Sequence, residues 1–247
     1  MSNTPHPSKE GTTAPSVLLP VLGAAGWKTV DTGALFAGRT VIVFSLPGAY
    51  TPTCSTSHVP RYQELLPTFK ANGVDEVVCV SVNDTFVMTA WQRDQAAPDL
   101  TFLPDGNGSF TEAMGMLVDK SAIGFGKRSW RYSMLVRNGV VEKMFIEPDE
   151  PGDPFLVSDA DTMLRYLNPD AKPPLDILLL TKPFCGHCTR AKAALAARGL
   201  AYDELPSTPR ALRAVSATPT TPQVWINGQH IGGADALIAY LEATTAG

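Results

Sequence analysis

A short polar segment between an apolar strand and an amphipathic helix constrains this chain more than any other feature. The segment reads Pro47-Gly48-Ala49-Tyr50-Thr51-Pro52-Thr53-Cys54, and the apolar run before it, residues 40–44, predicts a buried parallel strand. Residues 55–70 carry apolar side chains near helical spacing, and Gly73 ends the predicted helix. Cys54 is therefore expected in the first turn of a helix, where free backbone N–H groups and the helix dipole favour a thiolate.

The alternative is that Cys54 is a small buried thiol, as most lone cysteines are. The segment around it is too polar and too rich in proline for a core, so we interpret Cys54 as reactive. Thr51 can place its hydroxyl beside the sulfur, and Pro47 can fix and shield the loop. A cation from elsewhere should complete the site, and we expect Arg131 rather than Arg128, because a residue within the following strand is held more rigidly.

Length and composition allow one large domain or two smaller ones, without a strongly charged surface. The chain has 247 residues, of which 44% are apolar and 18% charged, with a formal net charge of −4. That charge argues against nucleic acid as a partner, and no apolar run approaches membrane length. Residues 1–14 predict a disordered tail rather than a signal peptide. We expect a cytoplasmic protein, in which four cysteines favour catalysis or metal binding over structural disulfides.

Alternating strands and helices predict an α/β fold with a boundary near residue 170. Residues 77–82 predict a second buried strand that contains an inert Cys79, and Asn83 and Asp84 predict a helix cap. The first half ends with a predicted helix over 109–118, a hairpin that turns at Asn138-Gly139 and a helix over 159–167. Residues 169–174 predict a linker. The pattern then restarts with expected strands at 175–181, 201–205 and 223–226, and expected helices at 189–198, 209–215 and 234–244.

The first half resembles the atypical type-five peroxiredoxins over residues 15–168. Pro47, Thr51 and Cys54 form the pattern Pro-x-x-x-Thr-x-x-Cys, and further matching segments are Trp27-Lys28-Thr29-Val30, Val82-Asn83-Asp84-Thr85-Phe86-Val87-Met88 and Arg131-Tyr132-Ser133. The resemblance implies a thioredoxin fold, a peroxidatic Cys54 surrounded by Pro47, Thr51 and Arg131, and a sulfenic acid intermediate. Residues 137–170 contain no cysteine, so a resolving cysteine late in this domain is not expected.

His58 follows Cys54 by four residues and is expected on the same helix face. A Cys-His pair for acyl transfer is one interpretation, but no Gly-x-Cys-x-Gly elbow or protease signature accompanies it. We expect His58 to tune or pack near the site rather than to act as a catalytic base.

The second half contains a Cys-x-x-Cys motif between a predicted strand and a predicted helix. Cys185 and Cys188 in this place are typical of thioredoxin-type redox sites, with the first cysteine exposed at the helix N-terminus. The motif also occurs in zinc sites, which need two further ligands. Cys54 and His58 would have to supply them from another strand-to-helix turn, so we expect no metal.

Residues 175–247 resemble a glutaredoxin. The matching segments are Thr181-Lys182-Pro183-Phe184-Cys185, Thr220-Thr221-Pro222-Gln223-Val224 and His230-Ile231-Gly232-Gly233-Ala234-Asp235. The resemblance implies that Pro222 is a cis-proline, that the Thr221 backbone pairs with glutathione, and that Lys182 holds the glycine carboxylate. It further implies that the γ-glutamyl end is held by Gly233, Ala234 and Asp235. Gly186-His187 between the cysteines is typical of protein disulfide isomerase, and Thr221 replaces the usual valine.

Together the halves resemble the bacterial hybrid peroxiredoxin–glutaredoxin proteins. The resemblance implies a peroxidase that reduces hydrogen peroxide and alkyl hydroperoxides and binds no cofactor. It also implies that Cys185 regenerates Cys54 with glutathione as the reductant. Glutathione reductase would act indirectly, and a short linker favours transfer between subunits of a homo-oligomer, a dimer or tetramer. Two alternatives remain open. One is a peroxide-driven protein disulfide oxidoreductase that uses Cys185 and Cys188, and the other is a redox relay or sensor.

Overall fold

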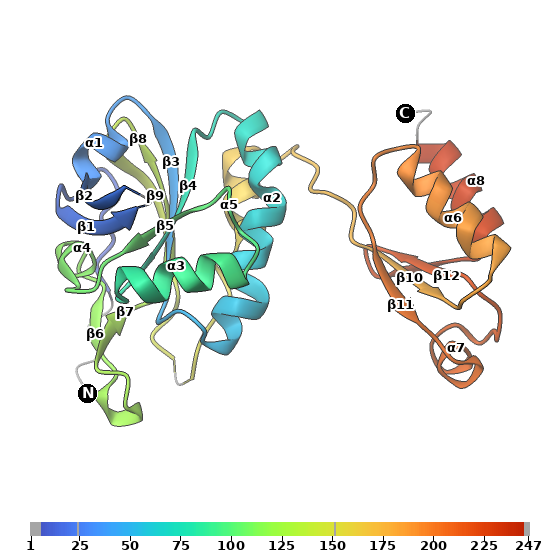
Figure 1. The fold of residues 1–247 in the computed structure, drawn as a ribbon. Coiled ribbons are helices and arrows are strands. Elements are labelled where there is room, and N and C mark those ends of the chain that lie inside the picture. The colour runs from blue at the N-terminus through green and yellow to red at the C-terminus, as the bar shows by residue number, and fades with distance from the viewer. Residues whose placement is uncertain (1–5, 24, 151, 245–247) are drawn as a thin grey trace. The chain divides into compact units, whose positions relative to one another are not determined.

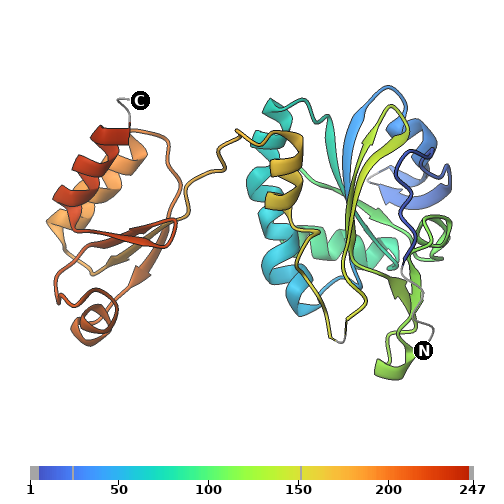
Figure 2. The same ribbon diagram turned by 180° about the vertical axis from the view of Figure 1, so that it is seen from behind.

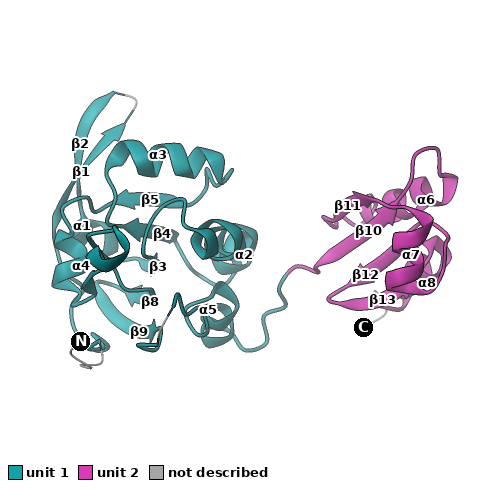
Figure 3. Ribbon diagram, turned by 90° about the horizontal axis from the view of Figure 1, so that it is seen from below, with its two compact units in different colours: residues 1–173 teal, residues 174–247 magenta. Residues whose placement is uncertain are grey.

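The computed structural model describes residues 6–23, 25–150 and 152–244. The described chain divides into two compact units, residues 1–173 and 174–247, which are coloured separately in Figure 3. The predicted linker, residues 169–174, ends within one residue of that division.

The first unit is built on a mixed sheet with the strand order β5-β4-β3-β8-β9. β3, β4 and β5 run parallel to one another, whereas β8 and β9 are antiparallel to their neighbours. The turn between β8 and β9 is the predicted one, with positive φ at both Asn138 and Gly139. The strands are β3 Thr40–Ser45, β4 Glu76–Ser81, β5 Thr101–Pro104, β8 Tyr132–Arg137 and β9 Val140–Ile146.

Both faces of this sheet are covered by a hydrophobic core. Side chains along a strand alternate between the two faces, so each strand contributes to both cores. Ile42 and Phe44 of β3 pack into one core with residues of α2, α3 and α5, whereas Val41 and Val43 pack into the core on the other face. Figures 1 and 2 show α2 and α5 together on the first face. The helices are α1 Thr32–Phe36, α2 Val59–Ala71, α3 Thr85–Asp94, α4 Ser109–Ala113 and α5 Ala160–Leu167.

Two smaller hairpins complete the first unit, and neither was predicted. β1 (Leu18–Gly23) pairs with β2 (Gly26–Asp31), and β6 (Leu117–Asp119) pairs with β7 (Lys127–Ser129), with a 3-10 turn, η2 (Ser121–Ile123), between the latter two. The predicted helix over 109–118 is therefore wrong beyond residue 113. Gly115 has a positive φ, which ends the helix before the chain enters β6.

The prediction of a disordered N-terminal tail is wrong for residues 9–14. The Gly11 and Ala14 N–H groups donate to the carbonyls of Val141 and Gly139, both at 2.8 Å, so this segment lies along the outer edge of β9. Glu10 also forms an ion pair with Lys143 at 2.9 Å. An edge strand offers unpaired backbone groups to any segment that reaches it, and here the N-terminal segment takes them. Residues 1–5 lie outside the described residues.

The second unit is a smaller mixed sheet with the strand order β11-β10-β12-β13. β10 pairs in parallel with β11 and antiparallel with β12. α6 and α8 pack side by side on one face, and their apolar residues form a core with β10 and β12 (Figure 1). The elements are β10 Ile177–Thr181, α6 Gly186–Ala196, β11 Asp203–Pro206, α7 Pro209–Ser216, β12 Gln223–Ile226, β13 Gln229–Gly232 and α8 Ala234–Thr244. Within the described residues, no helix combines the length and apolar character that crossing a bilayer requires.

Candidate active site

Cys54 lies where the loop after β3 becomes a helix. Residues Cys54–His58 form a π-helical turn, η1, that leads into α2, and the Val59 N–H donates to the Cys54 carbonyl. Such wide turns are rare, and they occur often at functional sites. Cys54 is a free thiol with no solvent exposure, on the face of the sheet that packs against α2. The predicted strand, loop and helix are thus confirmed, with a wider first turn than predicted.

Arg131 contacts the sulfur of Cys54. Its Nη1 lies 3.4 Å from Cys54 Sγ and 3.2 Å from His58 Nδ1, and its side chain is 2% exposed. The sequence predicts Arg131 within a strand, but the residue lies immediately before β8. Its backbone carbonyl accepts the Glu147 N–H at 3.1 Å, and its Nη2 donates to Asp153. These contacts, rather than strand pairing, fix the guanidinium beside the thiol.

His58 is held as a neutral ring. Nδ1 faces the guanidinium of Arg131 and therefore accepts, which places the ring proton on Nε2, 3.2 Å from the Ser158 carbonyl. Burial, with the positive charge of Arg131, lowers the pKa of His58 from 6.5 to about 3. Because both ring nitrogens already have partners, His58 is arranged to orient Arg131 rather than to exchange protons as a base.

Neutral burial of His58 predicts a loss of stability in mild acid. Between pH 6.5 and about 3 the unfolded chain binds a proton at His58 that the folded chain does not, so unfolding becomes easier as the pH falls through this range. From pH 7 to pH 5 we expect His58 to remove about 2 kcal/mol from the free energy of unfolding.

The measurement compares urea unfolding of the protein with that of His58→Asn at both pH values. In a Trp225→Phe background the remaining tryptophans, Trp27, Trp91 and Trp130, all belong to the first unit and report on it alone. The free energy of unfolding should depend more steeply on pH in the protein with His58 than in the His58→Asn variant. Equal pH dependence in the two proteins would contradict the neutral ring.

A buried carboxylate organises the loop that supports His58. Glu147, which is 2% exposed, accepts hydrogen bonds from the backbone N–H groups of Leu156, Val157 and Ser158 at 2.8–2.9 Å and from the Ser158 hydroxyl at 2.7 Å. The Ser158 carbonyl in turn accepts from His58 and from the Tyr62 hydroxyl at 3.1 Å. Glu147 thus connects the end of β9 to the ring that faces Arg131.

Thr51 and Pro47 belong to the loop that precedes Cys54. The Thr51 hydroxyl donates to the Gly48 carbonyl at 2.9 Å, so its remaining lone pairs can only accept further hydrogen bonds. Pro47 is half-buried and comes two residues after the end of β3. The prediction that Asn83 caps α3 is wrong, because only Asp84 caps this helix. Instead, Asn83 Oδ1 accepts the Ala49 N–H at 3.0 Å and thereby connects the loop before Cys54 to the end of β4.

Cys79 lies in the middle of β4 and is fully buried, as predicted. Burial raises the pKa of its thiol, so this cysteine stays protonated. Among the described residues, no His, Cys, Asp and Glu side chains gather in a group that could hold a metal ion.

In the second unit, Cys185 caps α6 and is joined to Cys188 by a disulfide. Cys185 Sγ accepts the Cys188 N–H at 3.2 Å, and the Thr221 hydroxyl donates to the same sulfur at 3.4 Å. Cys185 is partly exposed, whereas Cys188 is 3% exposed behind it. This is the predicted order of an accessible first cysteine and a buried second one.

The loop that carries Thr221 faces these cysteines. The Thr221–Pro222 peptide bond is cis, as predicted. Gly233 lies beside it, since a Cβ added there would stand 3.7 Å from the Pro222 carbonyl oxygen. Ala234 is buried as the first residue of α8. The structure therefore brings the predicted residues of this loop and of the Gly-Gly turn to one end of the sheet.

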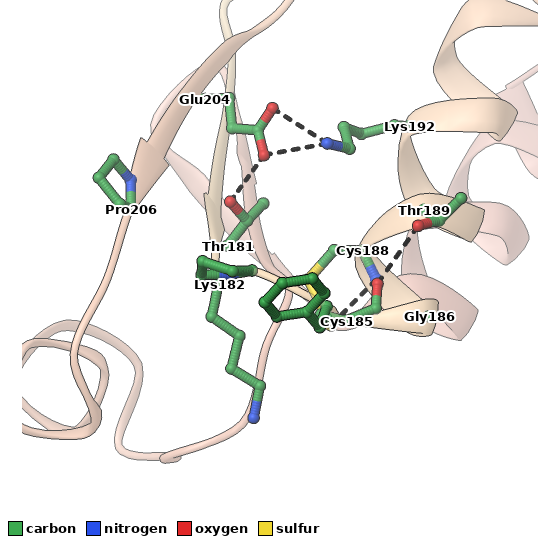
Figure 4. Close-up of a pocket in the computed structure, with 11 residues that line it drawn as sticks. Thr181, Lys182, Cys185, Gly186, Cys188, Thr189, Lys192, Glu204 and Pro206 are labelled. Carbon is green, nitrogen blue, oxygen red and sulfur yellow. Dashed lines mark hydrogen bonds and ion pairs between the residues drawn. A yellow bond between two sulfur atoms is a disulfide. The ribbon is translucent and has the colours of Figure 1, made fainter.

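A groove of about 500 Å³ opens along the first cysteine (Figure 4). Lys182, Cys185, Cys188, Lys192 and Glu204 are among the side chains that line it. The Lys192 ammonium is bound to the Glu204 carboxylate at 3.1 Å, and Glu204 also accepts the Thr181 hydroxyl. Lys182 points away from this pair in Figure 4. The predicted anion-binding lysine thus lies at the groove next to Cys185.

Asp235 is engaged in a way that the sequence did not predict. Its carboxylate forms an ion pair with Arg190 of α6 at 2.6 Å, and both side chains are more than half exposed. Arg190 lies five residues after Cys185 in the sequence, but only the packing of α6 against α8 brings it to Asp235.

Comparisons with known proteins agree with the division of the chain into two domains, each with its own cysteine site. A model of the Redoxin family matches residues 9–164, and a model of the Glutaredoxin family matches residues 177–231. The hybrid peroxiredoxin hyPrx5 of Haemophilus influenzae is 57% identical over 237 residues, which cover 94% of this chain and 98% of the relative. The chain belongs to the hybrid peroxiredoxin–glutaredoxin family.

Solved structures of similar proteins share the fold of about two thirds of this hybrid peroxiredoxin. Reduced Prx3 of Vibrio vulnificus in complex with hydrogen peroxide is 43% identical with a TM-score of 0.60, covering 64% of this chain and 98% of that one. The Plasmodium falciparum antioxidant protein, a 1-Cys peroxiredoxin, is 34% identical with a TM-score of 0.62, covering 66% of this chain and all of that one (100%). The chain is therefore a thiol peroxidase with two thioredoxin-fold domains in tandem, which confirms the predicted fold class.

Sequence reasoning missed the residues that act on the predicted site from a distance along the chain. Asp153, Glu147 and Ser158 have no motif of their own, and they reach the site only through the loop between β9 and α5. Arg190 in the glutaredoxin domain is a similar case. A buried carboxylate cannot be recognised without knowing which backbone N–H groups point at it.

Proposed function

We propose that this hybrid peroxiredoxin reduces hydrogen peroxide and alkyl hydroperoxides with electrons from glutathione. The Cys54 thiolate bonds to the outer peroxide oxygen, the O–O bond breaks, and the alkoxide leaves and takes up a proton, which gives a sulfenic acid. Glutathione then converts the sulfenic acid to a mixed disulfide and releases water. Cys185 takes over the glutathione as a mixed disulfide and frees Cys54. A second glutathione then releases glutathione disulfide and regenerates the Cys185 thiol; alternatively, Cys188 displaces the glutathione and forms the Cys185–Cys188 disulfide, which two glutathione molecules reduce.

The contact from Arg131 Nη1 to Cys54 Sγ, at 3.4 Å between two buried side chains, carries this proposal. A guanidinium beside the sulfur also lies next to the peroxide oxygen that gains charge when the O–O bond breaks, and a water-poor site strengthens that interaction. Thr51, whose hydroxyl donates to the Gly48 carbonyl, would accept a hydrogen bond from the peroxide O–H. Pro47 would keep this loop in place and shield it.

The buried position of Cys54 requires a second conformation for the reductive steps. A hydroperoxide is small, but glutathione and Cys185 need direct access to a sulfur that has no exposed surface here. The π-helical turn Cys54–His58 is the element that must open, because it carries the sulfur and lies at the helix end.

The glutaredoxin domain supports the proposed use of glutathione. Lys182 at the groove next to Cys185 would bind the glycine carboxylate, and the Thr221 backbone before cis-Pro222 would pair with the peptide. Gly233, Ala234 and Asp235 would hold the γ-glutamyl end. Since Asp235 is paired with Arg190, its carboxylate would have to share or leave that partner when the glutathione amine binds.

This proposal predicts the effect of removing each redox cysteine. With glutathione, glutathione reductase and NADPH as the electron source, the protein should consume peroxide, whereas Cys54→Ser and Cys185→Ser should each lose at least about 10²-fold, since each removes a nucleophile. Cys188→Ser separates the two routes for regenerating Cys185. Retained activity indicates release by a second glutathione, and lost activity indicates the Cys185–Cys188 disulfide. Full activity of Cys185→Ser would overturn the role of the second domain.

We also propose transfer between subunits of a homo-oligomer, a dimer or tetramer, in the reducing cytoplasm. The segment between the domains is too short for Cys54 and Cys185 of one chain to meet readily, whereas an oligomer holds the second domain of a neighbouring chain near Cys54 at an effective concentration of about millimolar. Mixing Cys54→Ser with Cys185→Ser chains, after subunit exchange, should then restore part of the activity, because each chain supplies the cysteine that the other lacks. No recovery in a verified mixed oligomer would show that transfer stays within one chain.

The Cys185–Cys188 disulfide also supports a second candidate, a peroxide-driven disulfide oxidoreductase for proteins. The sequence Gly186-His187 between its cysteines favours this use. In that case peroxide should oxidise a reduced client protein without glutathione, and Cys188→Ser should abolish the reaction. A redox relay or sensor would instead show slow turnover with a long-lived oxidised state.

A further inference from the structure

The solvent side of Arg131 is closed by a carboxylate that no motif marks. Asp153, in the loop between β9 and α5, accepts from Arg131 Nη2 at 2.5 Å, while Arg131 Nη1 faces Cys54 and His58. Arg131 is 2% exposed and Asp153 is 43% exposed. Asp153 therefore stands between solvent and the guanidinium that touches the sulfur.

The charges around Cys54 can be counted from these contacts. Arg131 carries one positive charge and Asp153 one negative charge, and His58 is neutral because its pKa is lowered to about 3. The Cys79 thiol is also neutral, because burial raises its pKa. Arg131 and Asp153 thus cancel, and formation of the Cys54 thiolate gives the cluster a net negative charge.

The surrounding loop strengthens this sign. Asp149 and Glu150, a few residues before Asp153, are both exposed. A hydroperoxide with a carboxylate would therefore approach a site whose cation is already paired and whose nucleophile is an anion, and it would be repelled. An uncharged hydroperoxide of the same shape meets no such penalty.

We propose that Asp153 makes the Cys54 site selective for uncharged hydroperoxides over those that carry an anionic group. Without this carboxylate, Arg131 would present a positive charge beside the sulfur that no acidic side chain balances. The inference rests on the proposed role of Cys54 as the cysteine that reacts with peroxide, and it is independent of how Cys54 is reduced.

The test uses the full chain, fully reduced, with less than one equivalent of hydroperoxide, and follows the disappearance of the hydroperoxide. Cumene hydroperoxide with a para-carboxylate is compared with its methyl ester, because the two share the reacting group and differ in charge. The protein should react faster with the ester. In Asp153→Asn, which keeps the size of the side chain, the ratio of ester rate to carboxylate rate should fall by about three- to tenfold at low ionic strength.

Glu150→Gln is the matched control, because it removes one negative charge from the same loop without removing the carboxylate bound to Arg131. Its ratio should stay within about twofold of that of the protein. An unchanged ratio in Asp153→Asn, or an equal fall in both variants, would overturn the selectivity assigned to Asp153. An equal slowing of both substrates in Asp153→Asn would also overturn it and would reduce Asp153 to a positioning residue for Arg131.

The same experiment separates this inference from the proposed function. If Cys54→Ser consumes both hydroperoxides as fast as the protein does, the proposed role of Cys54 fails whatever the rate ratio. If Cys54→Ser is inactive and the ratio is unaffected by Asp153→Asn, only the selectivity fails.

Discussion

Arg131→Met should slow the reaction of the reduced protein with hydrogen peroxide by about 10²- to 10³-fold, the cost typical of losing one charge-stabilising donor in an active site. Methionine keeps the length and apolar stem of the side chain but removes the guanidinium, whose Nη1 contacts both Cys54 Sγ and His58 Nδ1. Rapid mixing with excess peroxide, followed by tryptophan fluorescence or thiol titration, measures the rate without any reductant.

Two further variants test the geometry behind this expectation. Arg131→Lys keeps the charge but replaces a rigid fork by a single ammonium, so it should recover only part of the rate. Arg128→Met is the matched control, because Arg128 donates to the Val82 carbonyl and not to the sulfur. We expect it to lie within about threefold of the protein. A wild-type rate in Arg131→Met would remove this residue from the proposed chemistry.

Glu147→Ala should lower the free energy of unfolding of the first unit by about 3–5 kcal/mol. The substitution leaves the N–H groups of Leu156, Val157 and Ser158 without their acceptor in a buried place. It should also slow the peroxide reaction, because the Ser158 carbonyl would no longer be held against His58. Urea unfolding in the Trp225→Phe background measures the first effect, and rapid mixing measures the second.

Glu142→Ala on β9 provides the control for this prediction. Glu142 pairs with Arg137 at the surface, at 2.6 Å, with both side chains at least one third exposed. Surface ion pairs contribute little, so its loss should cost less than about 1 kcal/mol. If the free energy of unfolding of Glu147→Ala lies within about 1 kcal/mol of that of the unsubstituted protein, the carboxylate does not organise the loop.

The reliable sequence predictions concern residues whose partners are close along the chain. Strand β3, the loop that ends at Cys54 and the following helix depend on the spacing of apolar residues and on proline, and the turn at Asn138-Gly139 depends on two positive φ angles. The position of Cys185 at the start of α6 has the same local origin. Local preferences decide these features because the interacting atoms are at most a few residues apart.

The failures concern contacts between distant segments. The pairing of residues 11–14 with Gly139 and Val141 joins positions more than 120 residues apart, and the composition of the tail alone predicted disorder. The β6 and β7 strands, three residues each, are stabilised by each other rather than by their own propensities. In such cases tertiary pairing overrides the local signal.

The sequence by itself determined that Cys54 and Cys185 lie at helix starts, and it predicted Arg131 as the cation that contacts Cys54. Only the tertiary structure decided how that cation is used. Arg131 binds His58 of the turn η1 and Asp153 of the loop before α5, while Glu147 fixes that loop. The physical reason is that charge and hydrogen-bond partners are chosen by distance in space, and the buried site assembles them from segments separated by up to about 100 residues.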